Sequence, residues 1–247
     1  KGGQYVKEAK IGRAIMDADV FISLTHFKGH ELTGFGGAIK NIGMGCGSRA
    51  GKKEQHSNGK PHIDQYLCRS CRRCLRECAN SALVFDTVRK KMTVNKENCV
   101  GCGRCLGSCN FDAISFESDA AVEQLNYRMA EYAKAVVDGR PCFHISLVVD
   151  VSPYCDCHGE NDVPILPDLG MFASFDPVAL DQACADACLK AAPLPGSHLT
   201  DNMNKPDFVD HHDHFINSTP ESEWRSCLEH AERIGLGTRD YELIVVK

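Results

Sequence analysis

The sequence predicts an α/β fold, with a mainly parallel sheet flanked by helices and an α+β ferredoxin-like domain inserted into it. Helical patterns alternate with short apolar segments at both ends of the chain, which is typical of parallel sheets with helices on their faces. Eight of the 15 cysteines lie between Cys68 and Cys109. The segment 61–118 carries a net charge of +3 in a chain of net charge −5, and such a shift marks a domain boundary.

The elements before the cysteine-rich segment alternate between helix and strand. Apolar residues at helical spacing predict a helix over 5–17, and the short apolar run 19–24 predicts a buried strand. A glycine-rich stretch, 34–47, follows, with a short helix expected over 38–44.

The elements after the cysteine-rich segment continue this alternation. The strongest helical pattern is 121–138, and it ends at Gly139 and Pro141. Further helices are expected from Asp176–Pro177, an N-cap acid followed by proline, to about 189, and over 221–234. Strands are expected over 142–149 and 241–246.

The domain organisation follows from these elements. Residues 1–60 and 119–247 form one α/β domain, and residues 61–118 form the insertion. The chain starts at Lys1 and its predicted sheet has three strands. We therefore expect earlier strands of a longer protein to precede this sequence.

Composition excludes several classes of protein. The sequence has no secretion-signal pattern and no run of about 18 apolar residues. A membrane-spanning protein and a secreted disulfide scaffold are therefore not expected, and cytoplasmic metal binding is the better interpretation of the cysteines. The net charge of −5 and the sequence pI of about 6.1 also argue against nucleic-acid binding.

The cysteines of the insertion form two identical runs. Cys68-x-x-Cys71-x-x-Cys74-x-x-x-Cys78 is repeated as Cys99-x-x-Cys102-x-x-Cys105-x-x-x-Cys109. Short strand-like segments follow each run, at 82–85 and 113–116, and another, 92–94, precedes the second run. The insertion is therefore an internal repeat.

This pattern resembles the bacterial two-cluster ferredoxins. The resemblance implies two [4Fe–4S] clusters, each held by three cysteines of one run and the last cysteine of the other. One cluster then takes Cys68, Cys71, Cys74 and Cys109, and the other takes Cys99, Cys102, Cys105 and Cys78. Ala79 and Asn110 replace the proline that usually follows the last cysteine. A pair of zinc sites is the alternative.

Four arginines surround the first run, and they admit three interpretations. Guanidinium groups near an anionic cluster favour its reduced state, so the first cluster is expected to have the higher potential. The same charges also suit the docking of an acidic redox partner or a solvated basic surface. The residues are Arg69, Arg72, Arg73 and Arg76.

Two loops of the α/β part lie where open α/β sheets bind ligands. The glycine-rich loop carries Lys40 and Arg49, which suit an anion. The loop after the strand 142–149 carries soft metal ligands. A further metal site is possible there, with the candidate ligands Cys155, Cys157, His158, Cys46, His26, His30 and His56. Packing against the insertion is the structural alternative.

Longer motifs resemble the iron–sulfur centre proteins grouped as domain of unknown function 362. They are the strings 22–45, 155–157, 176–181 and 236–243. The resemblance implies a fold and clusters but no substrate. Electron transfer is the expected function. The alternatives are a redox or metal-dependent enzyme at the glycine-rich and Cys155/Cys157 loops, and clusters with a purely structural role.

Overall fold

The computed structural model describes residues 2–56, 60–101, 104–111, 113–116, 120–156 and 163–246. The chain divides into two compact units: unit 1 comprises 1–51 and 126–247, and unit 2 comprises 52–125. The sequence had suggested boundaries near 60 and 118, whereas the observed ones fall inside helices α3 (Arg49–Gln55) and α6 (Ala120–Val137). None of the helices formed by the described residues is long and apolar enough to cross a membrane.

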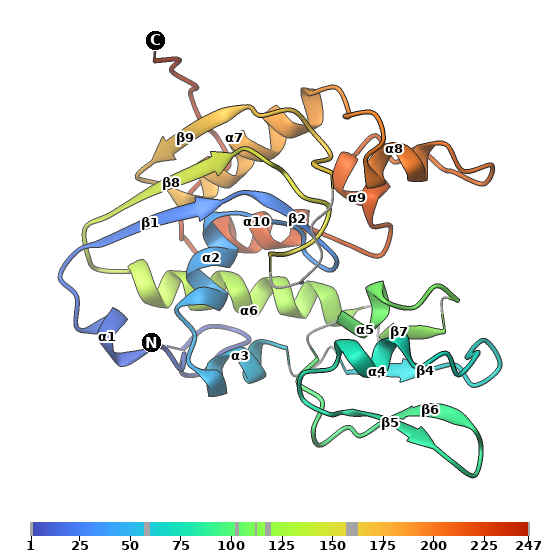
Figure 1. Ribbon diagram of the computed structural model, residues 1–247. Helices are drawn as coiled ribbons and strands as arrows, with labels where there is room; N and C mark the ends of the chain where they lie inside the picture. The colour runs from blue at the N-terminus through green and yellow to red at the C-terminus, as the bar shows by residue number, and fades with distance from the viewer. Residues whose placement is uncertain are drawn as a thin grey trace. The chain divides into compact units, whose positions relative to one another are not determined.

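Unit 1 contains a three-stranded sheet in the order β1-β8-β9 (Figure 1). Strand β1 (Phe21–His26) runs parallel to β8 (Cys142–Val148). Strand β9 (Gly170–Ser174), which the sequence analysis missed, runs antiparallel to β8. The prediction of a mainly parallel sheet is therefore wrong for this sheet, which is mixed. The loop between β8 and β9 contains no helical crossover among its described residues, so β9 returns beside β8 in the opposite direction.

The sheet buries polar side chains against helices and exposes apolar ones. Helices α2 (Ala38–Gly45) and α7 (Pro177–Lys190) pack against it (Figure 1). On the buried face, Ser23 Oγ lies 2.8 Å from His144 Nδ1, and burial lowers the pKa of His144 to about 4. Residues of the other face are largely exposed, namely Ile22, Leu24 and Met171.

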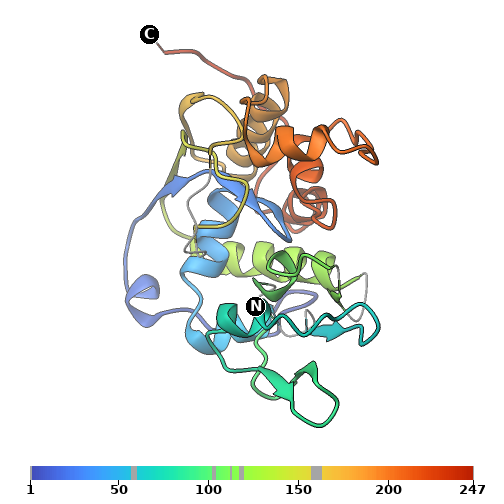
Figure 2. The same ribbon diagram turned by 45° about the vertical axis from the view of Figure 1, so that its right-hand side comes forward.

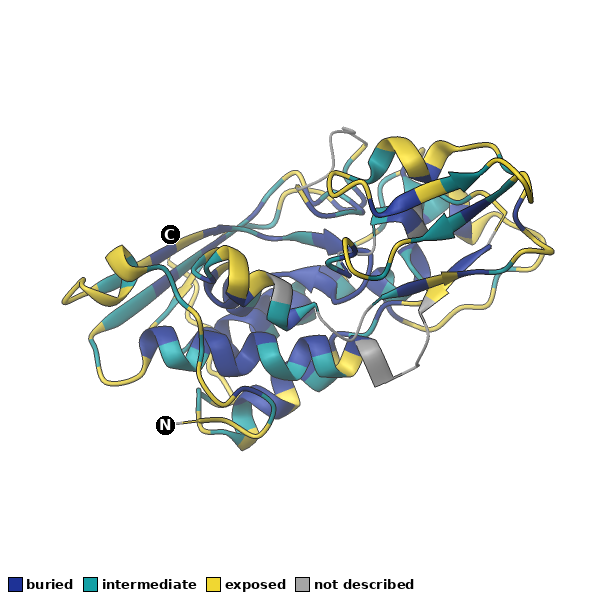
Figure 3. Ribbon diagram, turned by 90° about the horizontal axis from the view of Figure 1, so that it is seen from below, coloured by how far each residue is buried: buried dark blue, intermediate teal, exposed yellow. Residues whose placement is uncertain are grey.

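The predicted helix over 5–17 is wrong for most of its length, because only α1 (Arg13–Met16) is helical. A buried carboxylate on α6 holds the preceding backbone instead. Glu131 accepts hydrogen bonds from the backbone N–H groups of 4, 5 and 6 at 2.7 to 3.2 Å. Tertiary hydrogen bonds therefore override the local helical pattern. Helix α6 itself is buried along much of its length (Figure 3).

The C-terminal part of unit 1 is mainly helical. Helices α8 (His198–Met203) and α9 (His214–Ser218) lie side by side (Figures 1 and 2). Helix α10 (Arg225–Arg233) packs against α7. The predicted strand over 241–246 is wrong: this apolar segment pairs with no strand formed by the described residues, and most of its side chains are exposed.

Unit 2 is built twice from the same 31-residue pattern. The first half comprises β4 (Pro61–Ile63), α4 (Arg73–Glu77) and β5 (Leu83–Asp86). The second half comprises β6 (Lys91–Val94), α5 (Arg104–Gly107) and β7 (Ile114–Phe116). Strand β4 pairs with β7, and β5 pairs with β6, both antiparallel. The sequence analysis found all of these strands except β4.

Equivalent hydrogen bonds join the two halves of unit 2. Asp64 N–H donates to the carbonyl of Ala113, and Asn95 N–H, 31 residues after Asp64, donates to the carbonyl of Ala82. The same two residues accept, through their backbone carbonyls, the N–H groups of Cys68 and Cys99, which open the cysteine runs. The sequence repeat is therefore also a structural repeat in which each half depends on the other.

Candidate cysteine sites and the loops of unit 1

The first pocket of unit 2 gathers cysteines from both runs. Its lining includes Cys68, Cys71 and Cys74 of the first run and Cys109 of the second. Burial, and after it the neighbouring thiols of Cys109, Cys71 and Cys68, raise the pKa of Cys74 to about 11. Four thiols therefore line one pocket, although the first and the last of them are 41 residues apart in the sequence.

The second pocket has the reciprocal composition. Cys99 and Cys105 of the second run line it together with Cys78, the last cysteine of the first run. The N–H of Ala82 donates to the Cys78 sulfur at 3.2 Å. Cys102 lies outside the described residues. The described cysteines are therefore distributed between the two pockets in the crossed arrangement.

The loops that carry the first cysteines have left-handed backbone. Ser70 has φ of 58°, and Gly101, its equivalent 31 residues later, has φ of 72°. Arg72 also has φ of 64°. Left-handed backbone costs a residue other than glycine about 1–2 kcal/mol, and such costs persist where the surrounding structure requires them. The first run therefore keeps a costly loop shape that the second achieves with glycine at position 101.

The surface around the first pocket is basic. Arg69, Arg73 and Arg76 are exposed, and none of them forms an ion pair with another described residue. The Arg72 guanidinium lies 3.9 Å from the centre of the Phe85 ring. Cys71 is itself exposed. An anionic group in this pocket would therefore lie within reach of several unpaired cations and close to solvent.

The glycine-rich loop of unit 1 does not leave its helix N-terminus open. The N–H groups of Ala38 and Ile39, at the start of α2, donate to the buried carboxylate of Asp181 at 2.6 and 2.9 Å. A Cβ on Gly37 would lie 2.3 Å from this carboxylate, so glycine is required there. A side chain of α7 thus occupies the start of α2, and an anion bound by Lys40 and Arg49 stays a prediction. Arg49 begins α3 and takes no part in this contact.

The candidate ligands of a further metal are engaged in other contacts or undescribed. His30 is buried, and its Nδ1 accepts the N–H groups of Leu32 and Thr33. Cys46 caps the end of α2, and His56 follows α3. Cys157 and His158 lie outside the described residues. Among the side chains that are described, no three His, Cys, Asp or Glu are placed to hold one metal ion, so this site stays a prediction.

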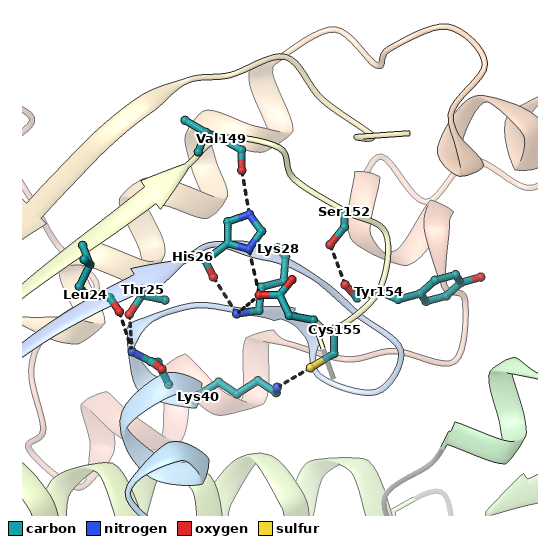
Figure 4. Close-up of polar contacts among 11 residues, drawn as sticks. Leu24, Thr25, His26, Lys28, Lys40, Val149, Ser152, Tyr154 and Cys155 are labelled. Carbon is teal, nitrogen blue, oxygen red and sulfur yellow. Dashed lines mark hydrogen bonds and ion pairs between the residues drawn. The ribbon is translucent and has the colours of Figure 1, made fainter. Parts of the chain in front are cut away.

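Two of these candidates, Cys155 and His26, contact charged side chains of unit 1. Lys40 Nζ lies 3.3 Å from Cys155 Sγ, and His26 Nδ1 lies 2.9 Å from the Asp156 carboxylate (Figure 4). Lys28 Nζ approaches the same carboxylate at 3.2 Å. Lys28 and Asp156 had not been predicted as site residues. The available signal was their position in the chain: Lys28 lies two residues after His26, and Asp156 directly follows Cys155.

Comparison with known proteins places the chain by family only. The family model described as "Domain of unknown function (DUF362)" matches residues 1–186. No curated protein and no solved structure matches the chain.

Proposed function

Because the chain belongs to the DUF362 family, whose description names no activity, we propose its function from its own residues: it binds two [4Fe–4S] clusters in unit 2 and transfers electrons through them. One observation carries this proposal. Cys109 shares a pocket with the first three cysteines of the other run, and Cys78 shares the reciprocal pocket.

The donor set fits cubic clusters. The first pocket offers four thiols, and the second offers three among its described residues. Cys102 directly follows Gly101, a lining residue of the second pocket, in the sequence. Thiolates are the usual protein ligands of such clusters, and N–H groups near their sulfurs tune the potential. When bound, a cluster supplies one-electron redox chemistry. The protein's part is to hold the thiolates, shield them from water and set the local charge.

The basic surface favours an acidic redox partner. A partner with a negative surface would be steered to the exposed arginines beside Cys71 and would meet the first cluster at its exposed ligand. This proposal makes the first cluster the point where electrons enter or leave. The many thiols also suit a reducing compartment such as the cytoplasm.

Metal and sulfide analysis of the anaerobically purified protein is the first test, with EPR spectra before and after dithionite. We expect about eight iron and eight sulfide per chain and a signal from reduced clusters. Zinc without sulfide would replace the proposal by structural zinc sites. Iron and sulfide that cannot be reduced reversibly would leave the clusters a purely structural role.

Paired cysteine variants test the crossed arrangement. Cys68→Ser with Cys109→Ser removes two ligands of one pocket, so about four iron should remain. Cys68→Ser with Cys78→Ser removes one ligand from each pocket, and both clusters should be weakened. Cys142→Ser is the matched control, because Cys142 begins strand β8 of unit 1. Equal iron loss in the two double variants would refute the crossed assignment.

A further inference from the structure

A thiol of unit 1, outside both cysteine pockets, lies within a group of charged side chains. The loop after β8 carries Cys155 and Asp156, and three basic side chains of β1, β2 (Lys28–His30) and α2 approach them (Figure 4). Lys40 Nζ lies 3.3 Å from the Cys155 sulfur. Cys155 is 8% exposed, so this ammonium group acts in a partly dehydrated setting, where charges interact more strongly than in water.

His26 holds the carboxylate that follows the thiol in the chain. Its Nε2 lies 2.9 Å from the carbonyl oxygen of Val149, and its Nδ1 lies 2.9 Å from the Asp156 carboxylate. Lys28 and Lys40 place two cations beside the single Asp156 carboxylate and the Cys155 sulfur. The surplus positive charge favours the thiolate form of the neighbouring cysteine.

The glycine motif of unit 1 builds this arrangement. Gly29 donates its N–H to the carbonyl of Ser152 at 2.8 Å, and a Cβ on Gly29 would lie 2.3 Å from the carbonyl oxygen of Pro153. Strand β2 therefore lies against the loop that carries the thiol. A Cβ on Gly36 would lie 3.1 Å from the Lys40 side chain and 3.4 Å from that of Lys28. Glycine at position 36 lets both lysines reach the loop.

The geometry points to a reactive thiolate site: we propose that Cys155, paired with Lys40, is a nucleophile for low-molecular-weight disulfides that carry negative charge. In the exchange, the Cys155 sulfur attacks one sulfur of the disulfide and a new S–S bond forms. The old S–S bond breaks, and its electron pair leaves on the other sulfur as a thiolate. Lys28 and Lys40 supply the positive surroundings for an anionic substrate.

The same contacts disfavour a metal ion at this thiol. An ammonium group 3.3 Å from the sulfur repels a cation, and both nitrogens of His26 are engaged in hydrogen bonds. The site is independent of the cluster proposal, since it uses none of the eight cysteines of unit 2.

Two disulfide reagents of different charge test the site in the cluster-loaded protein under anaerobic conditions. Dithiobis(nitrobenzoate) is dianionic and dithiodipyridine is neutral; peptide mass spectrometry locates the adducts. Cys142 is the internal reference, because burial and Asp176 raise the pKa of its thiol. Cys155 should react at least about tenfold faster than Cys142, with a larger advantage for the anionic reagent.

Three lysine variants separate charge from structure. Lys40→Met should lower the rate at which Cys155 reacts with the disulfide reagents about tenfold, an effect equal to a change of one pKa unit. It should also reduce the preference for the anionic reagent. Lys40→Arg keeps the charge and should restore most of the rate. Lys190→Met, an exposed residue at the end of α7, should change neither.

Three results would overturn the proposal: no adduct at Cys155, an unchanged rate in Lys40→Met with a native thermal melt, or a metal ion that Cys155→Ser removes. Iron and sulfide are measured on the same samples. Failure at Cys155 with eight iron retained therefore leaves the cluster proposal intact, and loss of iron with an active Cys155 does the reverse.

Discussion

The two units of this protein are held together by different means. The described apolar core of unit 2 has eight buried residues, and three of these are cysteines of the two pockets. The core of unit 1 is larger and is built from residues of the sheet, α2, α6, α7 and the C-terminal helices. Unit 2 therefore has little apolar burial apart from its ligands, whereas unit 1 packs like an ordinary globular domain.

Unit 1 also uses buried carboxylates where unit 2 uses thiols. Asp181 caps α2, Glu131 holds the backbone of 4–6, and Asp213 accepts the N–H groups that begin α9 and the Trp224 indole N–H at 2.9 Å. These three carboxylates of unit 1 are therefore satisfied by donors of the same unit. The buried cysteines of unit 2 instead line its two pockets.

The largest difference between the two units is expected when the proposed clusters are removed. Oxidation followed by chelation of iron should unfold unit 2, because metal binding and folding are coupled in small metal-binding domains, while unit 1 keeps its structure. Hydrogen exchange followed by mass spectrometry measures this: protection should be lost in 60–116 and kept in β8 and α7. Equal loss in both units would show that they fold as one cooperative unit.

The substitution Asp181→Asn should change the free energy of unfolding of unit 1 alone, by about a few kcal/mol. Burial raises the pKa of this carboxyl to about 7. Its folded-state pKa thus exceeds its ordinary value of 3.8, so its contribution to stability is complete at low pH and is lost as the pH rises toward and through 7. The wild-type protein should lose stability relative to Asp181→Asn as the pH rises from about 4 to about 7, between the unfolded and folded pKa values.

Urea unfolding of the cluster-loaded protein across this pH range measures the difference. Asp186→Asn is the matched control on the same helix, since Asp186 is only partly buried. A difference between Asp181→Asn and wild type that does not change with pH would contradict the argument.

A smaller effect is expected from the loops of unit 2. Gly101→Ser should destabilise the second half by about 1–2 kcal/mol, the cost of left-handed backbone with a side chain. Ser70→Gly relieves the same cost in the first half but removes the hydrogen bond from Ser70 Oγ to the carbonyl of Lys90, so it should be nearly neutral. The temperature at which the cluster absorbance is lost compares the two variants with the wild-type protein. Equal destabilisation by both would refute the equivalence of the two loops.

The smallest effect is expected from the arginines. Arg72→Gln with Arg73→Gln should lower the potential of the first cluster, because each exposed charge contributes about 0.5–1 kcal/mol, or about 20–40 mV for one electron. Arg104→Gln, beside the second pocket, should move the other potential. A redox titration followed by EPR measures both, and an unmoved first potential would refute the electrostatic role of these arginines.

Much of the secondary structure could be predicted because its signals are local. The helical pattern over 121–138 and the Asp176–Pro177 cap correspond to α6 and α7 within one residue or two. The predictions failed where distant residues decide the backbone. Glu131 keeps 4–6 out of a helix, and no described strand pairs with 241–246.

The cysteine spacing and the repeat could be predicted from the sequence, because each run is a short motif whose residues are close together in the chain. The resemblance to two-cluster ferredoxins predicted which sulfurs lie together, and the tertiary structure supplies the reason: the pairing of β4 with β7 brings Cys109 to the first run. Only the tertiary structure decided that Lys40 faces Cys155 and that Asp181 closes α2. The contacts of Lys40 and Asp181 join residues more than a hundred positions apart, and no local pattern in the sequence indicates them.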